Sequence, residues 1–345
     1  MDSIGIYIPG WWLRIADKSD RIFVNELFKT IKNSGCYKLL LLNLPRLRFS
    51  SQKEAMDFCH RKNLVLILQH DSPFLSFHPL VSNLRYKENV KLLENCVPFV
   101  NSFKAQERGY NKITTKNILN ENGLPVLDDK IVTSLQDLEN HIEEGKYYVI
   151  KPPDRGAGTG VKLIKKEGAN YLAYYNSEWR KIKITDKKLK NKKDGLSLNY
   201  SFNFLKSPLL TFKKIQIDFI YHLMLVEPYF NDKIEEFSSL RCTVIGDEIV
   251  EVVKRTNRKN ITSNISCGGR VEKFELSDYQ KKIAVAAKNA IGADYAGVDF
   301  LISNKKTVIG EVNIGPFGLW CQYSGVNVGK ILADYLIKKC DELKR

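Results

Sequence analysis

The chain has 345 residues, of which 43% are hydrophobic and 27% charged, and its formal net charge is +15. This length predicts more than one domain, and the composition excludes a disordered, collagen-like or coiled-coil chain. No stretch approaches eighteen consecutive apolar residues, so we expect no membrane-spanning helix. The positive charge favours an anionic partner, such as a nucleotide, a nucleic acid, an acidic peptide or a phosphorylated metabolite.

The cysteines and histidines argue against disulfides and zinc. Seven cysteines are spread singly without a CxxC pair, and the five histidines form no metal-binding spacing. The N-terminal sequence MDSIGIYIPGWW has no basic region ahead of its apolar run, so it does not read as a signal peptide. Reduced cysteines then predict a cytoplasmic protein.

The first hundred residues alternate short apolar runs with amphipathic helical patterns. We expect strands at 4–8, 37–44 and 64–68, and helices at 21–32 and 51–62. This order predicts a small parallel sheet with helices on its faces, a Rossmann-like βαβ domain. No GxGxxG motif follows the first strand, so a dinucleotide site is not expected. Trp11 and Trp12 follow that strand and suit either a ligand loop or a hydrophobic plug.

The pattern changes near residue 101. We expect helices at 111–122 and 134–144, a strand at 147–150, a β-rich section from about 223, and a closing helix at 328–339. Between them, the lysine-rich segment RKIKITDKKLKNKK (residues 180–193) reads either as a solvated excursion or as a docking strip for an acidic partner.

A glycine loop follows the strand that ends at Lys151. It contains Gly156, Gly158 and Gly160. Glycines let backbone N–H groups converge on phosphate oxygens, and the lysine adds positive charge. The lysine precedes the glycines and no GK[ST] occurs, so this is not a Walker loop. Taken alone, the segment also suits a tight hairpin turn.

A second pattern is the hairpin from Tyr295 to Asn313. Two apolar runs flank a predicted three-residue loop, Asn304 to Lys306. Folding the hairpin about its loop places Asp299 opposite Glu311, with Asn313 next along on the same face. Carboxylates buried that close repel, and a divalent cation removes the cost. All-oxygen ligands indicate Mg²⁺ or Mn²⁺. The alternative is a surface hairpin whose carboxylates pair with lysines.

A third pattern is a series of polar residues in the β-rich section. A strand at 240–245 carries Arg241, the return strand leads to Arg255, and Asn264 and the pair Gly268-Gly269 follow. Two arginines here could clamp phosphates or a carboxylate bidentately, although each alone is also compatible with an ordinary surface position.

Taken together, these segments resemble the ATP-grasp superfamily, specifically its RimK-like branch of carboxylate–amine ligases, over roughly residues 102–339. The resemblance implies an α/β (α+β) ATP-grasp fold preceded by the Rossmann-like βαβ domain. It implies an N-terminal domain at 1–100, a central ATP-grasp subdomain with the glycine loop at 101–226, and a C-terminal subdomain with the magnesium site at 227–345.

The resemblance also assigns roles to residues. The implied nucleotide-binding residues are Lys112, Lys151, Gly156, Gly158, Gly160, Glu227, Tyr229 and Glu235. The implied catalytic residues beside the acyl phosphate are Arg241, Arg255 and Asn264, and the implied metal ligands are Asp299, Glu311 and Asn313. Two positions depart from the family: Pro228 stands where a glutamate is common in the hinge, and Ser239 where an aspartate holds the ribose. Glu235 or Glu236 is the expected substitute at the ribose.

The function implied is an ATP- and Mg²⁺-dependent (or Mn²⁺-dependent) ligase that joins a small-molecule or peptide carboxylate to an amine through an acyl phosphate. The segment from Leu319 to Gly325 resembles the ligases that modify ribosomal peptides. The family further implies a homo-oligomer. Two alternatives stay open: an ATP-grasp kinase of a polyanionic small molecule, and a basic nucleic-acid- or peptide-binding protein without enzymatic activity. The intact nucleotide and metal residues speak against a nucleic-acid partner.

Overall fold

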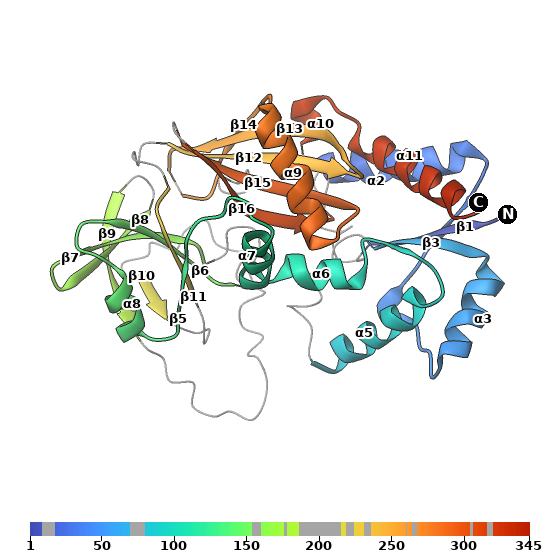
Figure 1. The fold of residues 1–345 in the computed structure, drawn as a ribbon, viewed down its shortest axis with the longest axis horizontal. Coiled ribbons are helices and arrows are strands. Elements are labelled where there is room, and N and C mark those ends of the chain that lie inside the picture. Colours follow the sequence, from blue (N-terminus) through green and yellow to red (C-terminus); the bar gives the residue numbers. More distant parts are fainter. Residues whose placement is uncertain are drawn as a thin grey trace. The chain divides into compact units, whose positions relative to one another are not determined.

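The computed structural model describes most of the chain in separate stretches. They are residues 1–8, 18–69, 80–153, 160–175, 178–185, 215–218, 224–230, 236–259, 261–263, 268–303, 306–315 and 320–345. The chain forms two compact units, each described by itself below (Figure 1). Unit 1 comprises Met1–Val126, Ser238–Arg255 and Val271–Arg345, and unit 2 comprises Leu127–Phe237 and Thr256–Arg270. Among the described residues, no helix is long and apolar enough to cross a membrane.

Unit 1 begins with the parallel sheet that the sequence predicts. Its strands, in the order β2-β1-β3-β4, are β1 (Ser3–Tyr7), β2 (Lys38–Leu41), β3 (Leu64–Gln69) and β4 (Phe99–Val100), and all of these pairs are parallel. The connecting helices are α2 (Lys18–Ser34), η1 (Leu44–Arg46), α3 (Gln52–Lys62) and α5 (Leu80–Glu94). Local chemistry defines the ends of α3: the Ser51 hydroxyl accepts from the Glu54 N–H, and Asn63 takes the left-handed conformation after the last turn.

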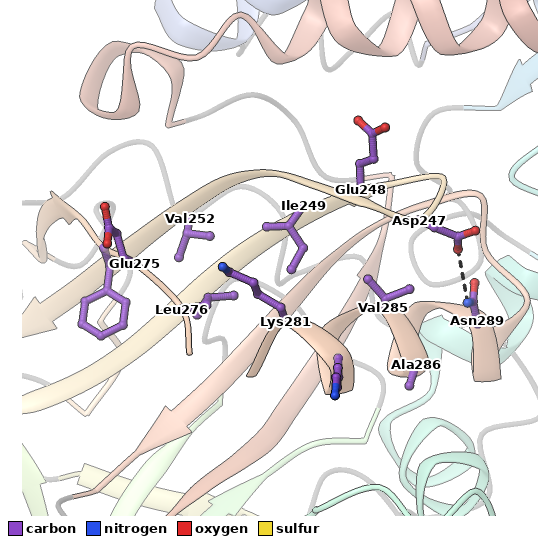
Figure 2. A pocket seen from close by; sticks show the side chains of 12 residues that line it. Asp247, Glu248, Ile249, Val252, Glu275, Leu276, Lys281, Val285, Ala286 and Asn289 are labelled. Atoms are coloured by element: carbon purple, nitrogen blue, oxygen red, sulfur yellow. Dashed lines mark hydrogen bonds between the residues drawn. The ribbon is translucent and has the colours of Figure 1, made fainter. Parts of the chain in front are cut away.

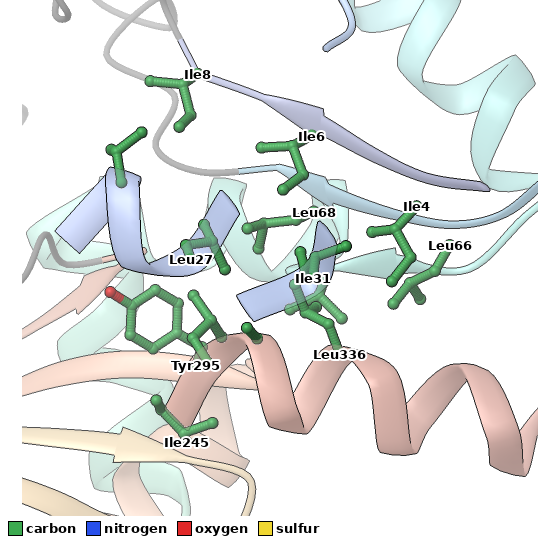
Figure 3. Close-up of a cluster of buried hydrophobic side chains, with 14 of the residues drawn as sticks. Ile4, Ile6, Ile8, Leu27, Ile31, Leu66, Leu68, Ile245, Tyr295 and Leu336 are labelled. Carbon is green, nitrogen blue, oxygen red and sulfur yellow. The ribbon is translucent and has the colours of Figure 1, made fainter. Parts of the chain in front are cut away.

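The closing helix α11 (Val328–Glu342) packs against the first sheet and α2. Leu332 and Leu336 of α11 lie in one fully buried cluster with Leu27 and Ile31 of α2 and strand residues such as Ile6 (Figure 3). The apolar stripe of the last helix therefore contributes to the core beside the first strand. The predicted boundaries at residues 100 and 226 stay a prediction; the chain passes between the two compact units after residues 126, 237, 255 and 270.

The second sheet of unit 1 has five strands in the order β14-β13-β12-β15-β16. They are β12 (Phe237–Ile245), β13 (Glu248–Asn257), β14 (Arg270–Lys273), β15 (Tyr295–Ile302) and β16 (Thr307–Ile314). On one face, an apolar cluster that includes Leu240, Cys242 and Val298 packs with α9 (Asp278–Ile291). Two short helices, α6 (Phe103–Tyr110) and α7 (Lys112–Glu121), contact the same region, and the single turn α10 (Cys321–Ser324) follows β16. The opposite face carries the polar residues described below.

The β15–β16 hairpin corrects one detail of the predicted register. The predicted loop would pair Ser303 with Thr307, but Thr307 pairs with Ile302, so the register beside the loop is shifted by one residue. A β-bulge then leaves Gly310 without a partner in the ladder, and beyond it Asp299 pairs with Glu311 as predicted. The bulge therefore compensates for this shift in register.

Unit 2 is built on a seven-stranded sheet in the order β10-β9-β8-β7-β6-β11-β5. The strands are β5 (Lys130–Val132), β6 (Tyr147–Lys151), β7 (Lys162–Glu167), β8 (Asn170–Tyr175), β9 (Glu178–Thr185), β10 (Ile215–Asp218) and β11 (Met224–Pro228), with helix α8 (Leu135–His141). Tyr148 and Ile150 of β6 join the apolar core with Leu138 of α8. The alternate residues of β6, Tyr147 and Lys151, lie on the other face.

Candidate active site

The three predicted metal ligands lie together on adjacent strands of unit 1. Asp299 pairs with Glu311, and Gly297 pairs with Asn313 one step further along the hairpin. The Asn313 side-chain amide donates to Asp299 Oδ2 at 3.2 Å. Asp299 is buried, with 8% of its surface exposed. Two carboxylates and one amide thus converge on one face of the sheet.

Two arginines neutralise Asp299. Arg241 of β12 pairs with Asp299 across the ladder and donates from Nε to Oδ1 and from Nη2 to Oδ2, the latter at 2.8 Å. Arg255 of β13 donates from Nη2 to Asp299 Oδ1 at 2.9 Å and from Nε to the Ser239 hydroxyl at 3.1 Å. Burial alone would raise the pKa of Asp299, but the two guanidinium groups outweigh burial and hold that pKa below its usual value.

Glu311 has a cationic partner of its own. Lys112 Nζ lies 3.2 Å from Glu311 Oε1. Lys112 is the first residue of α7, and the side chain of Asn111 caps this helix by accepting from the N–H groups of Ile113 and Thr114. We refer to Lys112, Arg241, Arg255, Asp299, Glu311 and Asn313 as the Asp299 cluster.

The donor set of the Asp299 cluster fits a hard cation. Magnesium in proteins is commonly held by one or two carboxylates together with phosphate and water oxygens. Asp299, Glu311 and Asn313 provide two carboxylates and an amide oxygen on neighbouring strands. No group of three or more His, Cys, Asp or Glu side chains suited to a metal occurs among the described residues. A metal here would therefore depend on oxygens from its ligand as well as on the protein.

The nucleotide residues predicted in unit 2 also come together. Lys151 Nζ lies 2.8 Å from Glu227 Oε1, and both side chains are almost fully buried. They are carried by the paired strands β6 and β11. The chain then continues through Pro228 to Tyr229, whose N–H donates to the Tyr147 carbonyl at 2.9 Å. The Tyr229 ring contacts the Tyr147 ring edge-on.

The last glycine of the loop after Lys151 is required by its conformation. Gly160 has φ +78°, and a Cβ at this position would lie 2.7 Å from Cγ of Pro152. A side chain would be excluded both by the backbone and by the proline. The loop therefore returns close to the strand end that carries Lys151.

Several predicted positions lie outside the described residues. They are Gly156, Gly158, Glu235, Asn264, Trp11, Trp12 and most of the lysine-rich segment. The roles suggested for these residues stay predictions. The first part of the lysine-rich segment is described, and it belongs to strand β9 up to Thr185.

Sequence reasoning missed one buried acidic residue on the polar face of the second sheet. Glu251 of β13 is 3% exposed, and its carboxylate accepts from the hydroxyls of Ser324 and Thr243. Burial raises the pKa of Glu251. Glu251 stands four residues before Arg255 in the same strand, so strand alternation was the signal that could have placed both on one face.

A cavity of about 1060 Å³ lies away from this chemistry (Figure 2). Its floor is formed by apolar residues of β13 and α9, including Ile249, Val252 and Val285, and charged residues such as Asp247 and Lys281 stand at its rim. It contains none of the predicted site residues, and Val252 alternates with the site-facing residues of β13. The cavity is therefore separate from the predicted site residues.

Comparisons with known sequences agree with the predicted family. Residues 211–336 match the family described as RimK-like ATP-grasp domain. The tetrahydromethanopterin:alpha-L-glutamate ligase of Methanocaldococcus jannaschii is 28% identical over 252 residues, which cover 72% of each chain. A probable alpha-L-glutamate ligase of Haemophilus influenzae is 40% identical over 110 residues, but this match spans only 30% of the present chain and 36% of the relative.

Solved structures resemble the chain over nearly its whole length. D-alanine–D-alanine ligase from Bacillus anthracis has a TM-score of 0.55 at 14% identity and covers 99% of this chain and 98% of its own. The ATP-grasp ligase PsnB complexed with minimal precursor has a TM-score of 0.58 at 15% identity and covers 98% and 99%. At such identities the likeness shows the fold alone, which is the ATP-grasp fold. The match at residues 211–336 and the shared fold both agree with the resemblance to a RimK-like ATP-grasp domain seen in the sequence.

Proposed function

We propose that the chain is an ATP-dependent ligase that joins the carboxylate of an amino acid or peptide to an amine through an acyl phosphate. The observation that carries the proposal is the charge balance of the Asp299 cluster. Two carboxylates, Asp299 and Glu311, contact three cations, Arg241, Arg255 and Lys112. Among the described residues the cluster thus brings three cations together with two carboxylates, a composition that suits an anionic ligand.

Phosphoryl transfer needs positive charge more than it needs a nucleophilic side chain. In the proposed reaction a substrate carboxylate oxygen attacks the γ-phosphorus of ATP, and the bond to ADP breaks. The amine nitrogen then attacks the acyl carbon, loses a proton, and phosphate leaves with the former carboxylate oxygen. In this proposal, Arg241 and Arg255 stabilise negative charge on the transferring phosphoryl oxygens, as preorganised donors do in other enzymes.

The metal would be held by Asp299, Glu311 and Asn313. When bound, Mg²⁺ or Mn²⁺ supplies charge neutralisation for the phosphates. The protein residues orient the carboxylate: Asn313 donates a hydrogen bond to Asp299 at 3.2 Å, and Arg241 contacts both oxygens of the same carboxylate. We assign nucleotide binding to Lys151, Glu227 and the backbone near Tyr229 in unit 2.

The names of the relatives support the substrate classes. The sequence relatives are named glutamate ligases, which supports an amino acid such as glutamate as the amine. The fold neighbour PsnB was solved with a precursor, which supports a peptide as one further candidate for the carboxylate. We propose both classes as substrates, with the amino acid tested first.

The test is ATP turnover with Mg²⁺ in a mixture of amino acids and small peptides, with hydroxylamine present to intercept an activated acyl group. ADP together with a hydroxamate is the expected result, and omitting single components then identifies the acid. ADP with a phosphorylated product would instead establish a kinase. Salt-sensitive binding to nucleic acid without ADP release would contradict an enzymatic role.

A further inference from the structure

The single turn α10 is attached to strand β13 at two points. At its start, the Trp320 ring lies over the Arg255 guanidinium, with 5.7 Å between Cζ and the ring centroid. At its end, the Ser324 hydroxyl donates to Glu251 Oε1. All four residues are nearly inaccessible: Trp320 is 4% exposed, Ser324 5%, Glu251 3% and Arg255 4%. The two contact points on β13 are four residues apart and face the same side.

The Ser324 hydroxyl connects the Glu251 carboxylate to the backbone that ends α10. It donates to Glu251 and accepts from the Val326 N–H at 3.1 Å. Gly325 takes the left-handed conformation, φ +73°, at the end of the turn. A helix of one turn has little stability of its own, so its position depends on such contacts.

Trp320 depends on α10 for its position. Its indole Nε1–H is buried without a hydrogen-bond partner among the described parts of the chain. The ring is therefore held by packing and by the turn that carries it. A carboxylate buried at Glu251 is costly unless its hydrogen bonds are satisfied, and Ser324 and Thr243 provide them.

We propose that Glu251 and Ser324 form a clamp that positions Trp320 over Arg255 and so fixes Arg255 for phosphoryl transfer. Glu251 and Ser324 are positioning residues, since they act through Trp320 and Arg255. Because the clamp rests on the proposed ligase activity, its test includes a measurement that does not require turnover.

The clamp has a specific kinetic consequence. Arg255 bonds to Ser239 and Asp299, and the Trp320 ring covers a further side of its guanidinium. If Trp320 is released, water reaches Arg255 and weakens its interaction with the phosphoryl group. Nucleotide binding through Lys151 and Glu227 in unit 2 is left in place. The clamp therefore predicts a loss in kcat with little change in the KM for ATP.

The kinetic experiment compares Ser324→Ala, Ser324→Thr and Glu251→Leu with the wild type. Loss of the hydrogen bond in Ser324→Ala should reduce kcat about tenfold and change the KM for ATP less than about twofold. Ser324→Thr keeps the hydroxyl and should recover most of the activity. The double variant Glu251→Leu with Ser324→Ala should be no slower than the worse single variant, because both substitutions remove the same hydrogen bond between Ser324 and Glu251. The exposed Glu248 of the same strand gives the matched control Glu248→Gln, which should leave kcat unchanged.

A second measurement follows Trp320 directly. The contribution of this tryptophan to acrylamide quenching is obtained by subtracting the signal of Trp320→Phe. In Ser324→Ala, the quenching of Trp320 should rise severalfold while the far-ultraviolet circular dichroism stays the same. Unchanged quenching in both Ser324→Ala and Glu251→Leu would overturn the clamp. A wild type that forms no hydroxamate would overturn the proposed function instead, while the quenching still decides the clamp.

Discussion

The two buried charge sites of this protein are balanced in opposite ways. In unit 2, Lys151 and Glu227 pair one cation with one anion at 2.8 Å. In unit 1, two carboxylates share three cations around Asp299. A one-to-one pair balances its two charges, whereas a cluster whose described members include more cations than carboxylates suits an anion. The comparison suggests that unit 1 contributes the charge for chemistry and that the unit 2 pair mainly orders a binding surface.

The largest effect is expected for substitution of Asp299, the carboxylate that both Arg241 and Arg255 contact. Asp299→Asn keeps the size of the side chain but loses its negative charge and with it one carboxylate ligand of the proposed metal. We expect ADP release to fall by at least about 10²–10³-fold. The substitution also leaves Arg241 and Arg255 without their shared anion, so thermal unfolding should be measured alongside. A variant that releases ADP at nearly the wild-type rate would contradict the assignment of the metal and phosphoryl site.

The next effect concerns the neutral pair in unit 2. Lys151→Met leaves Glu227 buried without its cation and should lower the free energy of unfolding by about 3 kcal/mol. Removing both charges with Lys151→Met and Glu227→Leu should restore most of that loss, because no unpaired charge remains. Urea denaturation followed by the fluorescence of Trp179, which stacks on Tyr147 in unit 2, reports this change. Equal destabilisation in the single and double variants would show that the loss of stability does not come from the unpaired charge of Glu227.

A smaller effect is expected for the more accessible pair in unit 1. The side chains of Lys112 and Glu311 are 11% and 32% exposed, compared with 10% and 4% for Lys151 and Glu227. Lys112→Met should therefore lower stability by roughly 1 kcal/mol or less. The same denaturation experiment compares it with Lys151→Met. A loss as large as that of Lys151→Met would remove the distinction between the two sites.

The smallest effect is a pH dependence of opposite sign for the two buried acids of unit 1. Arginines hold the pKa of Asp299 below its usual value, so its contribution to stability is present above the unfolded-state pKa and is lost as the pH falls through the folded-state value. Burial raises the pKa of Glu251, so its contribution is present at low pH and is lost as the pH rises through the folded-state value.

The measurement is urea denaturation of wild type and Glu251→Gln between about pH 4 and pH 8. The amide of glutamine does not titrate, so the stability of the variant relative to the wild type should increase as the pH rises above the ordinary carboxyl range. Relative stability that is constant with pH would show that Glu251 keeps an ordinary pKa.

Local patterns predicted more of this molecule than long-range ones. The βαβ order of the first hundred residues and the Asp299–Glu311 pair were both read from neighbouring segments, and the structure confirms them. The predicted register beside the loop of the same hairpin was wrong by one residue, because a bulge at Gly310 has no signal in the apolar pattern.

The arginine partners of Asp299 could not be foreseen. Arg241 and Asp299 are 58 residues apart, and their contact depends on β12 lying beside β15 in the sheet. Hydrophobic alternation predicts strands but not the order in which they pair. For this reason a divalent cation or surface lysines were the compensation expected for the carboxylates. The structure adds arginines from neighbouring strands, which changes the site from a pair of carboxylates to a cluster of two carboxylates and three cations.

The most direct test of the account is the fate of the substrate carboxylate oxygens. The acid identified by the hydroxamate assay is labelled with ¹⁸O in its carboxylate and turned over with ATP, Mg²⁺ and the amine. An acyl phosphate predicts that one labelled oxygen passes into the released phosphate in each turnover, and that Asp299→Asn abolishes this transfer. Amide product with all of the phosphate oxygen unlabelled would contradict phosphoryl transfer to the carboxylate and with it the proposed role of the Asp299 cluster.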